Sequence, residues 1–165
     1  MDIDKEGLSY FEEESHDFVI INHVLEHLFD PIYAVRECFR VLKKKGRLII
    51  AVPDMRYTFD KHRPLTTTKD IYQRIKRYPK KPNKDDYVDI LKFIHPSLLD
   101  KSEAKQNNAL QSFLDRREHI NIWTDDSFLE FFDEICTTFN INLKQETLFR
   151  SKENKFELAG CWIKA

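Results

Sequence analysis

Two short apolar runs, separated by an amphipathic segment, form the clearest pattern in the chain. Residues 18–21 (Phe-Val-Ile-Ile) and 48–52 (Leu-Ile-Ile-Ala-Val) are continuous and rich in β-branched side chains, which predicts strands buried on both faces. Between the two runs, apolar residues recur at three- and four-residue spacings from Ile32 to Leu42, which predicts a helix with one apolar stripe. The order strand, helix, strand predicts a βαβ unit with two parallel strands.

Local signals mark both ends of this helix. Asp30 is a favourable N-cap, and Pro31 suits the first helical position. At the other end we expect residues 43–45, all lysine, to lie in the last turn and Gly46 to form a left-handed cap. Ligands of such sheets bind beyond the carboxyl ends of the parallel strands. The candidate site regions are therefore residues 22–27 and 53–56.

The rest of the chain predicts helices and a terminal hairpin. Residues 66–116 favour a helical insertion with weak periodicity, interrupted by a charged loop that contains prolines. Residues 124–127 provide a cap for a strongly apolar helix. Residues 141–149 and 156–163 predict a C-terminal antiparallel β-hairpin. Together these segments indicate an α/β fold in a single domain.

Composition excludes several classes of partner. The chain has 165 residues, of which 41% are hydrophobic and 33% charged, and a net charge of −1, so we expect neither nucleic acid nor a membrane as partner. One basic stretch is interleaved with acidic residues, which favours a solvated loop. Because no signal peptide is visible and the cysteines are isolated among apolar residues, we expect a cytoplasmic protein. The basic stretch contains Lys76, Arg77, Tyr78, Lys80, Lys81 and Lys84.

Glycine is unusually scarce. The three glycines, Gly7, Gly46 and Gly160, lie far apart in the sequence. A backbone cradle for a nucleotide needs clustered glycines so that N–H groups can approach the ligand. The sequence therefore contains no such loop.

Several segments together resemble a known family. The string His-Val-Leu-Glu-His-Leu at residues 23–28, the Asp-Pro pair at 30–31 and the strand ending at Pro53 resemble the class I S-adenosylmethionine-dependent methyltransferases, in particular the type 11 group. Residues 118–128 resemble that family's segment before the terminal hairpin. The resemblance covers residues 7–60 and 117–165. It implies a partial Rossmann-like sheet in one truncated domain, residues 1–165, with the helical insertion at 66–116.

The family's first strand, Gly-rich loop and acidic ribose-binding residue have no counterpart in this sequence. The resemblance thus implies S-adenosylmethionine as cofactor if the site is completed, with methyl transfer to a small metabolite or a sugar hydroxyl. The alternative is a non-catalytic or split-enzyme module that pairs through an open sheet edge. Its partner would be a second copy, forming a homodimer, or a chain that carries the N-terminal half.

Four residues are candidates for binding the cofactor. Gly7 and Leu8 resemble the family segment beside the adenine ring, although a simple core contact is equally consistent. Asn22 and His23 lie at the end of the first strand, where the family packs its loop against the cofactor. A structural role in the turn fits them equally well.

Four other residues are candidates on the acceptor side. His119 is the best general base, because the ordinary pKa of histidine, near 6.5, suits neutral pH. Asp54 could accept the proton of a substrate hydroxyl or form a hydrogen bond with it, and Arg56 could hold an anion. The alternative is a capped loop with an exposed ion pair. His27 either faces the substrate or fixes the turn.

A metal-binding motif also overlaps this region. Residues 23–27 match H-x-x-E-H, an inverted zinc-protease motif. That motif needs both histidines on one helix, and the new helix start at Asp30 leaves no room for it. We therefore expect no metal site of this kind.

Overall fold

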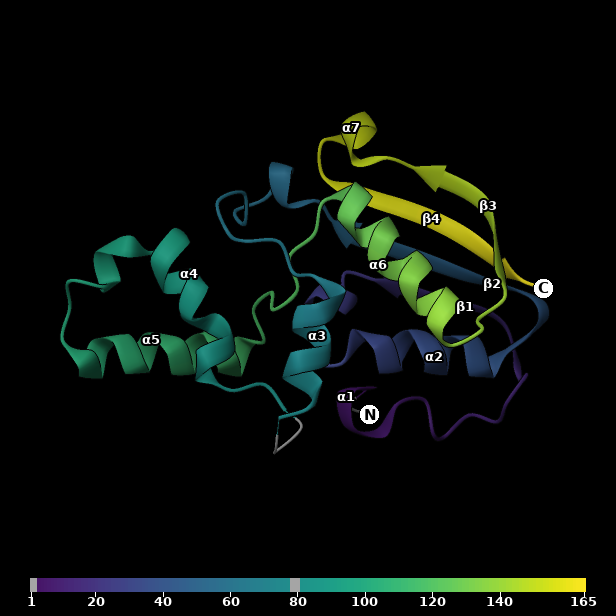
Figure 1. Cartoon of the computed structure of the whole chain (residues 1–165), viewed down its shortest axis with the longest axis horizontal. Helices are drawn as coiled ribbons and strands as arrows, with labels where there is room; N and C mark the ends of the chain where they lie inside the picture. The colour runs from purple at the N-terminus through teal and green to yellow at the C-terminus, as the bar shows by residue number, and fades with distance from the viewer. Residues whose placement is uncertain (1–2, 78–80) are drawn as a thin grey trace.

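The computed structural model describes residues 3–77 and 81–165, which contain a four-stranded mixed sheet (Figure 1). The strand order is β1-β2-β4-β3. β1 (His16–Asn22) runs parallel to β2 (Leu42–Pro53), and β4 (Glu157–Lys164) is antiparallel both to β2 and to β3 (Leu143–Phe149). The predicted fold class, two parallel strands with a C-terminal antiparallel hairpin, is confirmed.

Helix α2 (Pro31–Val41) connects the two parallel strands and begins as predicted. The Asp30 carboxylate accepts a hydrogen bond of 2.8 Å from the backbone N–H of Tyr33, and Pro31 occupies the first turn. Its C-terminal end differs from the prediction. The helix stops at Val41, and the three lysines at 43–45 already belong to β2.

Gly46 is not the helix cap that its position suggests. The left-handed residue here is Lys45, with φ of 65°. Gly46 is needed because a Cβ atom would lie 2.8 Å from the carbonyl oxygen of Lys43 and 3.1 Å from that of Asp17. The glycine thus permits a close approach of two backbones rather than a turn.

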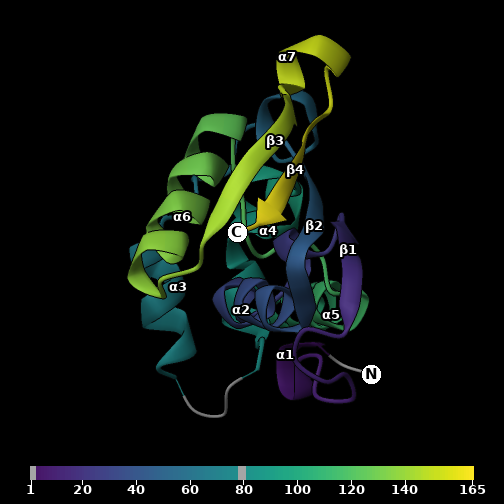
Figure 2. The same cartoon turned by 90° about the vertical axis from the view of Figure 1, so that its right-hand side faces the viewer.

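Only one face of the sheet is covered by helices in the described part of the chain. Alternate residues of β2, Leu48, Ile50 and Val52, pack in one cluster with α2, with α3 (Thr68–Ile75) and with α6 (Asp125–Thr138). On β1, Phe18 and Ile20 remain 59% and 55% exposed. The prediction that β1 is buried on both faces is therefore wrong, because β1 is an edge strand with one open face (Figure 2).

Helix α6 matches its prediction closely. Thr124 is the N-cap, and its hydroxyl and that of Ser127 form a reciprocal capping box. The helix buries an aromatic face against the sheet, and the rings of Phe132 and Trp162 lie 4.9 Å apart. The buried residues on this face are Phe128, Phe131, Phe132 and Ile135.

The segment between β2 and α6 is helical, and α3 is its part that packs against the sheet. Besides α3 it contains η3 (Lys84–Tyr87), α4 (Val88–Phe93), η4 (Pro96–Leu98) and α5 (Glu103–Arg116). Figure 1 shows α4 and α5 extending away from the sheet. These elements have a hydrophobic cluster of their own, formed by Tyr87, Ile90, Leu91, Leu110, Phe113 and Ile120.

The remaining elements are short: α1 (Ile3–Glu6), η1 (Leu25–His27), η2 (Met55–Tyr57) and α7 (Ser151–Asn154). Within the described residues, no helix has both the length and the apolar character needed to cross a bilayer. Of the basic stretch, Tyr78 and Lys80 lie outside the described residues, and Arg77 pairs with Asp86 at 2.6 Å.

Candidate functional site

The chain turns sharply after the carboxyl end of β1. His23, the residue after the strand, has a left-handed backbone with φ of 51°. Residues 25–27 then form the single turn η1. The H-x-x-E-H residues consequently do not form the helix that the zinc-protease motif requires.

A second segment holds this turn in place. The side-chain amide of Asn121 donates hydrogen bonds of 2.8 Å to the carbonyls of Leu25 and Leu28. The backbone N–H groups of Ile120 and Asn121 donate to the carbonyl of Glu26 at 2.8 and 2.9 Å. Residues 119–121 are therefore fixed against the end of β1 although they are about a hundred positions away in sequence.

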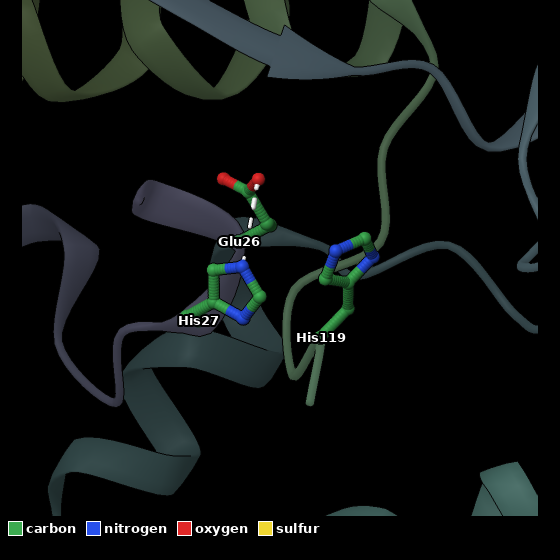
Figure 3. A group of neighbouring side chains, drawn as sticks. All are labelled: Glu26, His27 and His119. Carbon is green, nitrogen blue, oxygen red and sulfur yellow. Dashed lines mark ion pairs between the residues drawn. The ribbon is translucent and has the colours of Figure 1, made fainter. Parts of the chain in front are cut away.

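This packing gathers Glu26, His27 and His119, which we call the Glu26–His27–His119 group (Figure 3). One carboxylate or imidazole atom from each lies within 4.8 Å of the other two. Nε2 of His27 is 3.8 Å from Oε1 of Glu26, and the two imidazole rings meet edge to face with centroids 4.7 Å apart. The sequence-predicted base His119 and the candidate His27 thus lie side by side.

Glu26 is the buried member of the group. Its residue is 1% exposed, and neither carboxylate oxygen has a hydrogen-bond partner. Burial raises the pKa of Glu26 above its ordinary value, although the charges of His27, His119 and His23 act in the opposite direction. The site therefore contains a carboxylate that lacks the hydrogen bonds usually found for a buried acid.

Both imidazoles are oriented by acceptors on their Nδ1 atoms. Nδ1 of His119 lies 2.7 Å from a carboxylate oxygen of Asp60, and Nδ1 of His27 lies 2.6 Å from the carbonyl oxygen of Arg117. Each of these oxygens can only accept, so the Nδ1 atoms donate. In the neutral rings, Nε2 then carries the free lone pair on both histidines.

A buried ion-pair chain supports His119. Arg63, 3% exposed, contacts Asp60 and Asp89 at 2.7 Å each and donates to the carbonyl of His119 at 2.9 Å. Burial alone would raise the pKa of Asp60, but His119 and Arg63 more than offset this effect and lower it. Asp60 is thus a stable anion that orients His119.

Sequence reasoning missed Asp60. It lies in an irregular loop 59 positions before His119, and no motif surrounds it. Only the fold shows that the two side chains meet.

His23 borders the group on the side of the sheet. Its Nε2 contacts a carboxylate oxygen of Glu157 at 2.5 Å, its Nδ1 is 3.4 Å from Glu26, and its ring stacks on Phe156. Asn22, the last residue of β1, is exposed. A cavity of about 480 Å³ opens beside these residues; its lining consists of Ile3, His23, Val24, His27, Leu28, Arg116 and Arg117.

Asp54 and Arg56 form a separate, tightly paired structure after β2. The buried Asp54 carboxylate accepts hydrogen bonds from the guanidinium of Arg56, the hydroxyl of Ser151 and the backbone N–H of Asp125. Burial opposes ionisation, but these donors hold the pKa of Asp54 at about 2. This is the geometry of a capped loop with an ion pair, and it gives Asp54 little basicity at neutral pH.

Gly7 and Leu8 lie against α2 rather than along the cavity beside His23. Gly7 is left-handed, with φ of 57°, and a Cβ atom there would come within 2.8 Å of the Glu37 side chain. The backbone N–H of Leu8 donates to the Glu37 carboxylate at 2.9 Å. The N–H that could meet an adenine ring is therefore engaged by a side chain of the chain itself.

Comparison with known families finds a match in the N-terminal part of the chain. Residues 2–50 match the family model described as a methyltransferase domain. The matched segment contains β1, α2 and most of β2, together with the turn that holds Glu26 and His27. The predicted resemblance to the type 11 methyltransferases is thus confirmed for this part of the chain, and no curated protein sequence matches the chain.

Two solved structures that are partly similar to the chain are described as methyltransferases. The chain is 13% identical to a SAM-dependent methyltransferase from Thermotoga maritima, with a TM-score of 0.44, over 94% of this chain and 59% of that one. A methyltransferase from Bacillus halodurans is also 13% identical, with a TM-score of 0.40, over 93% and 69% of the two chains. The chain therefore spans less than two thirds of the Thermotoga maritima protein.

Proposed function

We propose that this chain is part of an S-adenosylmethionine-dependent methyltransferase. When its donor site is complete, the enzyme would methylate a small metabolite or a sugar hydroxyl. The observation that carries the proposal is the position of His27 and His119 beyond the carboxyl end of β1. β1 and His27 belong to the segment that matches a methyltransferase domain, and His119 is packed against that segment. Ligands of α/β sheets bind beyond the carboxyl ends of the parallel strands.

The chemistry of the reaction assigns a role to His119. Methyl transfer forms a bond between the acceptor oxygen and the methyl carbon while the carbon–sulfur bond of the sulfonium breaks, and the hydroxyl proton must leave. Nε2 of His119 has a free lone pair and is oriented by Asp60, so it suits the acceptance of this proton. His27 would hold the acceptor beside it, and most of the rate enhancement would come from proximity and orientation.

The other candidate residues take supporting roles in this proposal. Asn22 and His23 would border the donor, because Asn22 is the last residue of β1 and His23 follows it. Asp54 and Arg56 fix the loop after β2 through their mutual ion pair. Gly7 and Leu8 fix the N-terminal segment on α2.

S-adenosylmethionine is supported as the methyl donor by the family match of residues 2–50. The missing Gly-rich loop means that the donor site would need a second component.

Calorimetric titration of the chain with S-adenosylmethionine, followed by transfer of a labelled methyl group to a panel of sugars and small alcohols, tests the proposal. With the donor site completed, we expect methylation of a hydroxyl acceptor, and a loss of about 100-fold in rate for His119→Ala with little change for His62→Ala, an exposed histidine in a nearby loop. Equal rates for the two variants would contradict the role of His119.

A specific observation also favours the second candidate, a module that pairs through its sheet. The edge strand β1 exposes the large apolar side chains Phe18 and Ile20. Such an edge is a template for pairing with another chain. Sedimentation equilibrium and the calorimetric titration together distinguish the two candidates. A monomer that binds S-adenosylmethionine supports the enzyme, whereas a dimer with no heat of binding supports the module.

A further inference from the structure

The buried carboxylate of Glu26 needs a positive partner that the structure does not supply through hydrogen bonds. Among residues 3–77 and 81–165, Glu26 alone has buried carboxylate oxygens without a hydrogen-bond partner. Other buried acids, such as Asp54 and Asp60, are held by arginines and by hydroxyl or imidazole groups. A buried charge without such compensation is costly. A ligand that offers concentrated positive charge would remove that cost.

The two histidines next to Glu26 have the arrangement of metal ligands. Nδ1 of His119 donates to the carboxylate of Asp60, and Nδ1 of His27 donates to a backbone carbonyl. Metal-binding histidines are typically oriented in this way, with the other ring nitrogen left free for the ion. Both Nε2 atoms are available, and the group's donor atoms lie within 4.8 Å of one another.

We propose that Glu26, His27 and His119 bind a divalent transition-metal ion such as Zn²⁺ or Mn²⁺. Two imidazole nitrogens and one carboxylate oxygen suit these ions better than Ca²⁺ or Mg²⁺, which prefer oxygen ligands. Ligands about 2.1 Å from one ion stand about 3 to 3.5 Å apart, so small side-chain rotations would close the site. Three protein ligands leave positions open for water or an acceptor oxygen.

This site differs from the H-x-x-E-H motif in residues 23–27. That motif would use His23 and His27 on one helix, with the glutamate as base. Here Nε2 of His23 is engaged by Glu157, and the second histidine, His119, comes from the distant segment before α6. The ligand set follows from tertiary packing and not from the spacing of the motif.

The ion would also change how the acceptor is activated, an extension that rests on the proposed function. A hydroxyl oxygen bound to the ion loses its proton to water more readily, because the ion lowers the pKa of an oxygen ligand. Nε2 of His119 is then a ligand and cannot accept the proton, so the bound ion would replace the imidazole as activator.

Metal binding can be measured without donor or acceptor. The EDTA-treated chain is titrated with Zn²⁺ and with Mn²⁺ by calorimetry, and its Co²⁺ form is examined by visible absorption. We expect one ion per chain, and at least a 100-fold loss of affinity in Glu26→Gln and in His119→Ala. Asp60→Asn should lower the affinity for the ion about tenfold, because it removes the carboxylate that orients His119. His62→Ala is the matched control and should bind as the unaltered chain does.

Two outcomes would overturn the metal site. One is the absence of binding by the unaltered chain at millimolar ion; the other is binding that Glu26→Gln and His119→Ala leave unchanged while circular dichroism shows that they are folded. If the ion binds as expected but no hydroxyl is methylated, the proposed function fails and the metal site stands.

Discussion

At the scale of single residues, the site depends on contacts that no local pattern encodes. His119 could be picked out from the sequence because histidine titrates near neutral pH. Its partner Asp60 could not, because 59 residues separate them and their meeting depends on the loop after β2. Glu26 belongs to a recognisable string, but its burial without hydrogen bonds follows only from how residues 119–121 close over the turn.

The charge of Glu26 should cost stability in the metal-free chain. Its pKa is raised by burial, so the folded chain keeps the proton at pH values where the unfolded chain has lost it. Stability from this group is therefore full below the ordinary value of 4.5 and falls as the pH rises through the folded pKa. Glu26→Gln removes this loss.

We accordingly expect Glu26→Gln to raise the free energy of unfolding at pH 7.5 and to leave it unchanged near pH 4. Urea unfolding at the two pH values, with EDTA present, measures the difference. A variant less stable than the original chain at pH 7.5 would show that the Glu26 anion is already compensated.

At the scale of elements, the ends of α2 show where local signals suffice. The Asp30 cap uses a hydrogen bond within one turn, and the structure has it. The opposite end is decided by pairing between strands, since His16 of β1 pairs with Leu42 and draws the chain into β2 before the lysines are reached. Gly46 consequently allows a close backbone contact with Asp17, whereas the local sequence pattern predicts a helix cap at this position.

Strand β4 offers a test of packing in the covered face of the sheet. Gly160 faces Trp162, and a Cβ atom at Gly160 would overlap the indole ring. The ring is 4% exposed and packs against Phe132 of α6, so it has little room to move. We expect Gly160→Ala to lower the free energy of unfolding by about 2 kcal/mol, as overpacking does.

Thermal unfolding of Gly160→Ala beside Ala159→Ser measures this effect. The neighbouring Ala159 lies on the opposite, half-buried side of β4 and provides a small substitution without the indole contact. A Gly160→Ala variant as stable as Ala159→Ser would mean that the indole shifts without cost.

At the scale of the whole molecule, the sequence predicts a more complete sheet than the structure contains. A continuous apolar run such as residues 18–21 is typical of a strand with layers on both faces. The described chain supplies α2, α3 and α6 on one face only, so Phe18 and Ile20 are left exposed while Ile21 is buried. The apolar pattern of β1 therefore suits a second layer on its open face, which a partner chain paired at the β1 edge could supply.

This exposure leads to a prediction about association. Replacing both Phe18 and Ile20 by lysine should abolish any self-association of the chain, because it puts charge on the open face and edge. It should cost less than about 1 kcal/mol of stability, since both side chains are more than half exposed. Ile21→Lys, on the covered face of the same strand, should instead prevent folding. Sedimentation velocity and thermal unfolding of the two variants measure both effects. A double variant that fails to fold, as Ile21→Lys should, would mean that this face is already covered. The pairing surface would then have to lie elsewhere.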